Sequence, residues 1–192
     1  MAPHRDVRPG YTVIHPNRDR AICKATRILV VVVLLVSVAL MLAVTVGGWS
    51  KLEGMIPVNF IWCAIYLVMA VFIARWARGL LPIAGVLGLL LLAIALIATV
   101  GFGGTSWFDR SSASYGAAHA LGGGPGLSSD TIGTLVLLLV PVEVVLILVA
   151  IVGFAQGWNV ELEVPDEEAA ARRAGGRGRP GTGFGGGRAA AT

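Results

Sequence analysis

The chain has 192 residues, a mean hydropathy of +0.79, a net charge of +4 and only 14% charged residues. Soluble domains carry about a quarter charged residues, so this composition excludes an ordinary soluble protein. The only two cysteines, Cys23 and Cys63, exclude a disulfide framework and a CxxC metal site. We therefore expect a membrane protein.

Residues 1–27 form a basic N-terminal arm. Within this arm, residues 10–16, GYTVIHP, are short, β-prone and end at a proline. A second such stretch follows the last apolar run: residues 159–165, NVELEVP, alternate apolar and acidic side chains as a strand does. The two stretches either pair as a small ribbon or remain two extended linkers, because an isolated two-stranded ribbon is only marginally stable.

Four apolar runs are each long enough to cross the hydrocarbon layer as a helix, which takes about 20 residues. They comprise residues 28–48, 57–77, 81–102 and 132–155. Pro57 and Pro82 take first-turn positions. Asp130 or Thr131 can cap the fourth helix. The short connection between the second and third runs predicts that these two helices are antiparallel neighbours. The predicted fold is all-α, a polytopic four-transmembrane-helix bundle over residues 28–157.

Basic residues are distributed unequally between the two ends of these helices. Thirteen lie before the first run, between the second and third runs, or after the fourth, whereas only Lys51 and Arg110 lie at the other end. The positive-inside rule then places both termini in the cytoplasm. The apolar part of the first run is too long for a signal peptide, so we expect it to stay as an anchor.

The predicted outer loop, residues 103–131, is rich in Gly, Ser and Ala. Its Asp109 and His119 could be combined with Ser128 into a hydrolase triad. A triad needs a rigid scaffold and an oxyanion hole, and nothing in this loop supplies either. The glycines at 122–126 lack the Gly-Lys-Ser/Thr ending of a phosphate-binding loop. We predict that the protein is not an enzyme and holds no metal or cofactor.

The fourth run is followed by a juxtamembrane segment and short helix, residues 158–174, and a Gly/Arg tail, residues 175–192. The tail is too polar to fold, so we expect it to be disordered. Arginines beside a membrane favour anionic lipid headgroups by about 1 kcal/mol each. The five arginines after the fourth run, with one phenylalanine, are weak support for RNA binding, and we predict no nucleic-acid partner.

Glu143 lies in the middle of the fourth run, two residues after Pro141. That run holds seventeen Leu, Ile, Val or Phe residues, worth about −5 to −10 kcal/mol of insertion free energy. One central acid costs only about 2.5–3.5 kcal/mol on the same scale. The helix is therefore expected to insert with the acid, and Pro141 is expected to kink it.

The carboxyl of Glu143 needs polar partners from other helices, because its own helical face is apolar. Counting about 1.5 Å per residue puts Ser37 of the first run and Tyr66 of the second at a comparable depth. We expect the carboxyl to keep its proton unless a cation is near. Two roles remain open: a hydrogen bond that joins helices or proteins, or a proton- or ion-coupled transport site built on Glu143, Pro141, Tyr66 and Ser37.

Small residues recur at every fourth position in three of the apolar runs. These candidate helix-packing residues are Ala39, Ala43, Gly47, Ala84, Gly88, Gly153 and Gly157. Such spacing lets helix backbones approach closely, and packing within the chain is enough to explain it.

Two segments carry a resemblance. IHPNRDRAICKATR, residues 14–27, and GFAQGWNVELEVP, residues 153–165, resemble those of small four-span integral membrane proteins of high-GC Gram-positive bacteria. The resemblance covers about residues 10 to 165. It implies a location in the bacterial plasma membrane and no chemistry, and no site residue is carried over from it.

The sequence thus favours an accessory, assembly or scaffold subunit without a catalytic site. It would work as a homo-oligomer or in a larger membrane complex, within the lipid bilayer and beside anionic headgroups. The alternative is a small proton- or ion-coupled transporter or channel that uses Glu143.

Overall fold

The computed structural model describes residues 9–52, 54–100 and 119–175. The chain is mostly helical in this part and contains four helices long and apolar enough to cross a membrane. It forms two compact units: Asn17–Asn159, and a smaller one built from the chain up to Pro16 and from Val160 onward. The first residues of the arm, most of the predicted outer loop with Asp109, and the predicted disordered tail from 176 on lie outside the described residues.

The four long helices are α2 (Ala21–Gly47), α3 (Ile56–Ala74), α4 (Leu81–Val100) and α6 (Ser129–Ala155). Short helical turns lie beside them: α1 (Pro16–Asp19), η1 (Trp49–Lys51) and η2 (Arg78–Leu80). Helix α2 begins seven residues before the predicted run, because hydropathy marks the apolar part of a helix and not its first residue. Helix α3 ends three residues earlier than predicted, at a turn described below.

The predicted cap of the fourth helix was wrong. Neither Asp130 nor Thr131 caps α6, because the helix begins at Ser129 and its N-cap is Ser128. The Ser128 hydroxyl accepts a hydrogen bond from the Thr131 backbone N–H at 3.2 Å. Residues 128–131 are all of the types that favour N-caps, and the first of them, Ser128, takes the position.

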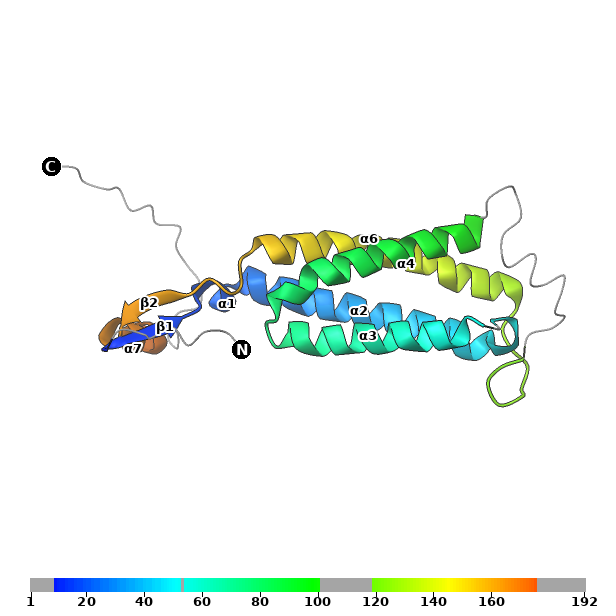
Figure 1. The fold of residues 1–192 in the computed structure, drawn as a ribbon, viewed down its shortest axis with the longest axis horizontal. Helices are drawn as coiled ribbons and strands as arrows, with labels where there is room; N and C mark the ends of the chain where they lie inside the picture. The colour runs from blue at the N-terminus through cyan, green and yellow to red at the C-terminus, as the bar shows by residue number, and fades with distance from the viewer. Residues whose placement is uncertain (1–8, 53, 101–118, 176–192) are drawn as a thin grey trace. The chain divides into compact units, whose positions relative to one another are not determined.

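The long helices pack in the order α3, α2, α6, α4 (Figure 1). Although α3 and α4 are antiparallel and joined by a short connection, they make few contacts, so the expectation that they pack as neighbours was wrong. Small residues on α4, Ala84 and Gly88, are buried and let α4 approach α6 closely. A groove of about 570 Å³ remains between α3 and α4, lined by apolar side chains such as Val68, Phe72 and Ile83.

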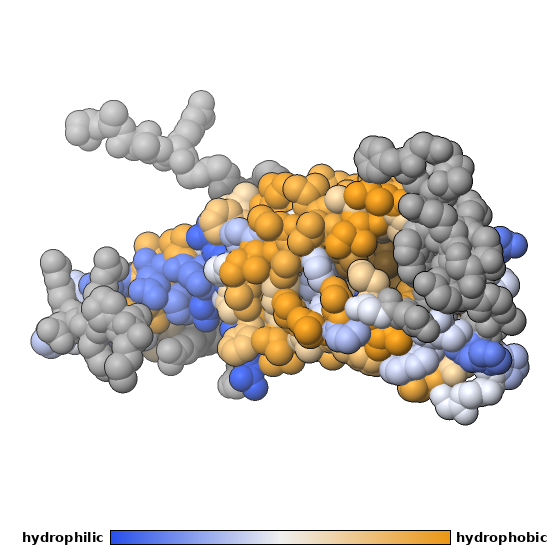
Figure 2. Space-filling model, turned by 45° about the vertical axis from the view of Figure 1, so that its right-hand side comes forward, coloured by the Kyte–Doolittle hydropathy of each residue, from blue (hydrophilic) through white to orange (hydrophobic). Residues whose placement is uncertain are grey.

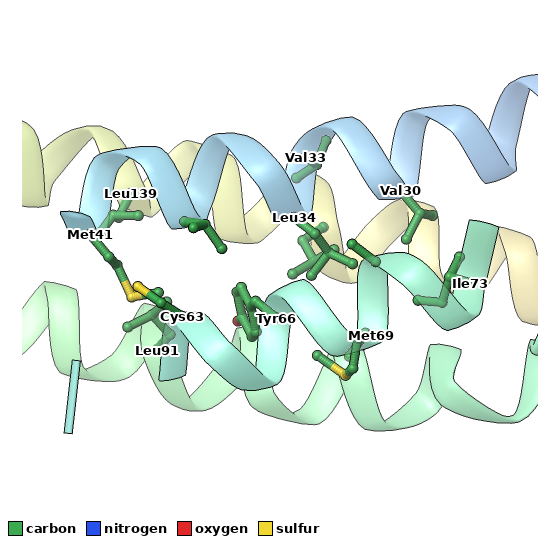
Figure 3. Packing of buried hydrophobic residues seen from close by; sticks show 14 of the residues in the cluster. Val30, Val33, Leu34, Met41, Cys63, Tyr66, Met69, Ile73, Leu91 and Leu139 are labelled. Atoms are coloured by element: carbon green, nitrogen blue, oxygen red, sulfur yellow. The ribbon is translucent and has the colours of Figure 1, made fainter. Parts of the chain in front are cut away.

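The core of the helical unit is apolar and runs along the helix axes (Figure 3). Val30 and Leu34 of α2 and Ile73 of α3 are fully buried in it. The outer faces are also apolar, as the visible face of the helical unit shows (Figure 2); Val86 is 67% and Ile151 61% exposed. Helices that are apolar all round are typical of membrane spans.

The smaller unit contains the ribbon that the sequence left open. Strand β1 (Tyr11–Ile14) pairs antiparallel with β2 (Leu162–Pro165), with Tyr11 opposite Pro165 and Ile14 opposite Leu162. The ribbon prediction is therefore confirmed over two separate linkers. Helix α7 (Asp166–Gly175) follows directly, and its Ala169 is buried. Packing of a helix on the ribbon supplies the stability that two strands alone lack.

Candidate functional site

Glu143 lies on α6 at the centre of a polar group that joins three helices. Its side chain is fully buried, as are those of Ser37 on α2 and Tyr66 on α3. Ser37 Oγ lies 2.7 Å from Glu143 Oε1, and the Tyr66 hydroxyl donates to Oε2 at 3.1 Å. The structure thus brings together three of the four residues that we predicted for the intramembrane site.

The hydrogen atoms of this polar group can be counted. Ser37 Oγ also lies 3.1 Å from the carbonyl oxygen of Val33, but a serine hydroxyl has only one hydrogen to donate. If Ser37 donates to Val33, its 2.7 Å contact with Glu143 requires a hydrogen on the carboxyl. With a neutral carboxylic acid, each of the three contacts has one hydrogen: Ser37 donates to Val33, Glu143 to Ser37, and Tyr66 to Glu143. A carboxylate would leave one contact without a hydrogen and a charge buried without a cation.

Gly88 of α4 closes the fourth side of the Glu143 site. A Cβ atom at this position would lie 3.1 Å from Glu143 Oε2 and 3.3 Å from the side chain of Leu146. Glycine is therefore the residue that allows α4 to approach the carboxyl. The sequence singled out Gly88 for helix packing, but its small-residue spacing did not indicate which side chain it accommodates.

Pro141, the fourth predicted member, is not part of this polar group. It is exposed, two positions from the buried Glu143 and thus on the other side of the helix. Helix α6 continues through it from Ser129 to Ala155. Its missing N–H removes one backbone hydrogen bond without bringing a polar atom to the carboxyl.

An apolar cavity of about 300 Å³ lies next to the Glu143 site. Its lining includes Met41, Leu91 and Leu139, and Leu139 precedes Glu143 by one helical turn. Asn59 is its one polar lining residue, and its amide donates to Thr45 Oγ1 at 3.1 Å. Apolar cavities stay dry, so this one offers little to a hydrated ion.

The predicted packing residues divide into three groups. Ala84, Gly88 and Gly153 are buried between helices, whereas Ala39 and Ala43 are exposed on α2 and add nothing to the core of the chain. Gly47 faces Leu127, whose side chain would clash with any Cβ there. Gly157 has a φ of +62°, so the left-handed end of α6 is the reason for glycine at that position.

A second polar cluster, which sequence reasoning missed, lies at the other end of α6. Gln156 donates to Thr26 Oγ1 at 2.8 Å and accepts from Trp158 Nε1 at 2.9 Å. Asn17 donates to the carbonyl oxygens of Gln156 and Gly157 at 3.1 and 2.9 Å. Trp158 is fully buried. No local pattern in the sequence indicates that Trp158 folds back into the bundle.

The residues of the hypothetical triad take structural positions where they are described. His119 donates its backbone N–H to Ser50 Oγ at 2.7 Å, and Ser128 caps α6. Cys23 and Cys63 are free and buried. Among the described residues, no group of three or more His, Cys, Asp or Glu side chains could hold a metal ion.

No protein-family model matches the chain, and no curated protein or solved structure matches it. The functional argument therefore depends on the geometry of these polar groups and on the apolar helices that hold them.

Proposed function

We propose that the chain is a multi-pass protein of the bacterial plasma membrane with both termini in the cytoplasm. Four helices of sufficient length and hydropathy support membrane insertion, and the excess of arginine and lysine at one end supports the orientation. In this orientation the α3–α4 connection and the end of α6 lie at the cytoplasmic face.

Within that membrane, the protein acts as a non-catalytic accessory, assembly or scaffold subunit, in a homo-oligomer or a larger complex. The observation that carries this proposal is the complete burial of Glu143 against Ser37 and Tyr66 of its own chain. A carrier acid must exchange its proton or ion with one side and then the other, whereas this carboxyl is satisfied within the bundle. The geometry of the Glu143 carboxyl therefore favours a structural role, in which it joins α2, α3 and α6.

Affinity purification of the full chain from its native host in mild detergent tests this role. Native and peptide mass spectrometry then identify what remains bound. A stoichiometric second protein, or a defined homo-oligomer that persists on dilution, is the expected result. A monomer that brings down no partner would contradict the subunit role.

A second candidate, a proton- or ion-coupled transporter, is favoured by one observation, the acid Glu143 in the middle of a membrane-length helix. Proton flux into liposomes separates the two candidates. A carrier loses flux in the Glu143→Gln variant while it remains folded, because an amide cannot release a proton. If Glu143 is structural, the wild type shows no proton flux and the Glu143→Gln variant still folds.

A further inference from the structure

The end of α3 holds a tryptophan where helices usually hold a glycine. The N–H of Ala77 donates to the carbonyl of Phe72 at 3.0 Å and that of Trp76 to Ile73 at 2.9 Å, which is the Schellman pattern of a helix C-terminus. Trp76 occupies its left-handed position, with a φ of +69°. This conformation costs a residue with a Cβ about 1–2 kcal/mol, and a bulky side chain keeps it only where its surroundings demand it.

The contacts of the Trp76 ring explain why it keeps this conformation. It meets the buried Trp158 ring edge to face, with centroids 5.5 Å apart. The guanidinium carbon of Arg27 lies 4.2 Å from the Trp76 ring centroid, and that of Arg18 lies 5.9 Å from it. The ring is therefore a platform that holds two cations from the start of the chain at the end of α3.

Arg27 keeps one edge of its guanidinium unused. Its Nη1 donates to the carbonyl of Ala74, at the end of α3, at 3.0 Å. Its Nε is buried and has no hydrogen-bond partner among the described residues. The N–H groups of Nε and Nη2 are parallel and form the fork that grips an oxyanion with two hydrogen bonds.

No described carboxylate neutralises this group of arginines. Arg18 donates to the Trp158 carbonyl and the Asn159 side chain, and Arg78 donates to the Phe154 carbonyl at 2.8 Å. The ion pair found among the described residues joins Lys24 and Asp19 instead. Positive charges held together without a carboxylate favour an anion from outside the chain.

We propose that Arg27, with Arg18 and the Trp76 platform, binds the phosphodiester of one anionic phospholipid headgroup in the cytoplasmic leaflet. A small turn of the Arg27 side chain uncovers its buried Nε, so that the fork can take two phosphate oxygens. Arg18 adds a second positive charge. Stacking on the Trp76 ring holds the guanidinium in one orientation, which suits a phosphate group that is itself held at the membrane surface. This inference rests on the proposed membrane orientation, which puts the end of α3 at the cytoplasmic headgroups.

Insertion and orientation of the full chain are checked first in spheroplasts and in inverted membrane vesicles of the host, where protease should reach the C-terminal tail only from the cytoplasmic side. Delipidated protein in detergent is then titrated with phosphatidylglycerol, and bound lipid is measured by native mass spectrometry. Arg27→Gln is expected to weaken binding about five-fold, equivalent to about 1 kcal/mol. Arg20→Gln is the matched control, since Arg20 is exposed and no contact joins it to Trp76; it is expected to change binding less than two-fold.

Two further variants keep the proposal testable if Arg27→Gln fails to fold. Arg27→Lys keeps the charge but loses the fork, and Trp76→Gly keeps the left-handed turn but loses the platform; both are expected to weaken binding. Equal weakening by Arg20→Gln would overturn the site in favour of general surface charge. Displacement of the lipid by inorganic phosphate would overturn the headgroup assignment. Failure of insertion or reversed orientation would count against the proposed function instead.

Discussion

The two polar regions of the helical unit differ in how completely they are satisfied. In the middle of the bundle, Glu143, Ser37 and Tyr66 are fully buried, and their hydrogen atoms match their acceptors if the acid is neutral. At the end of α3, arginines stack on Trp76 and keep hydrogen-bond donors and positive charge in excess.

This difference separates a structural role from a binding role. A polar group in an apolar interior must find its partners inside the chain, because the surrounding lipid offers none. A polar group at the helix ends meets headgroups and water, so it can keep donors for a ligand. We therefore expect variants of the middle region to change stability and variants of the end region to change binding.

The largest effect is expected for Glu143→Ala. This change leaves a cavity and removes the acceptor of the Tyr66 hydroxyl, so the free energy of unfolding should fall by about 2–5 kcal/mol. Glu143→Gln is the matched control. Its amide can donate to Ser37 and accept from Tyr66, as a neutral acid does, so the loss should stay within about 1 kcal/mol.

Unfolding in a mixed detergent titration measures both Glu143 variants. If the amide proved as damaging as alanine, the carboxyl would be ionised in the folded protein and the hydrogen count at Ser37 would be wrong. The middle region would then carry a charge, and the contrast with the helix end would disappear.

The Gly88→Ala variant tests the close approach of α4 to the site. Its Cβ would lie 3.1 Å from Glu143 Oε2, and such overpacking should lower the free energy of unfolding by about 1–3 kcal/mol. Gly85→Ala, one turn away, should have little effect, since the nearest atom to its Cβ, in Ala150, is 3.9 Å away. Equal effects from the two alanines, measured in the same titration, would mean that helix α4 can shift away from the carboxyl.

Trp76→Gly and Trp76→Ala test the strained end of α3. Alanine is normally the better residue in a helix, but at a φ of +69° glycine should be more stable than alanine by about 1–2 kcal/mol. Thermal unfolding of the two variants side by side measures this difference. A more stable alanine variant would show that the turn relaxes once the ring is gone, and that the ring contacts alone impose it.

The smallest effect is expected for Tyr66→Phe, which removes one hydrogen bond and keeps the ring. Hydrogen bonds between membrane helices contribute about 0.6 kcal/mol on average and up to about 1.7 kcal/mol. A double-mutant cycle with Ser37→Ala measures the coupling of the two donors through Glu143. Strict additivity would mean that they do not act through a shared carboxyl.

Long, uniform features of the fold could be predicted from the sequence. The four apolar helices, the two extended segments at 11–14 and 162–165, and the short helix after Pro165 follow from hydropathy, alternation and turn residues, which act over a few neighbouring positions. Whether the two extended segments pair was left open by the sequence and was decided by the structure. Depth counting along the helices also selected Ser37 and Tyr66 as partners of Glu143, because both lie on helices whose rise per residue is constant.

Features that depend on which helix lies beside which could not be predicted in this way. The sequence offered no sign that α4 would pack on α6 and leave α3, that Gly88 would face the carboxyl, or that Trp158 would fold back to Gln156. Ala39 and Ala43 are exposed for the same reason: the spacing of small residues does not say which helix, if any, packs against them.

The sequence by itself determined the number of membrane-length helices and the uneven distribution of positive charge, because hydropathy and charge are sums over local residues. Only the tertiary structure decided that Glu143 finds its partners within its own chain while Arg27 keeps an N–H group without a partner among the described residues. Those outcomes depend on side chains far apart in sequence, such as the left-handed Trp76, which meets Arg27 and Trp158 only after the helices have packed.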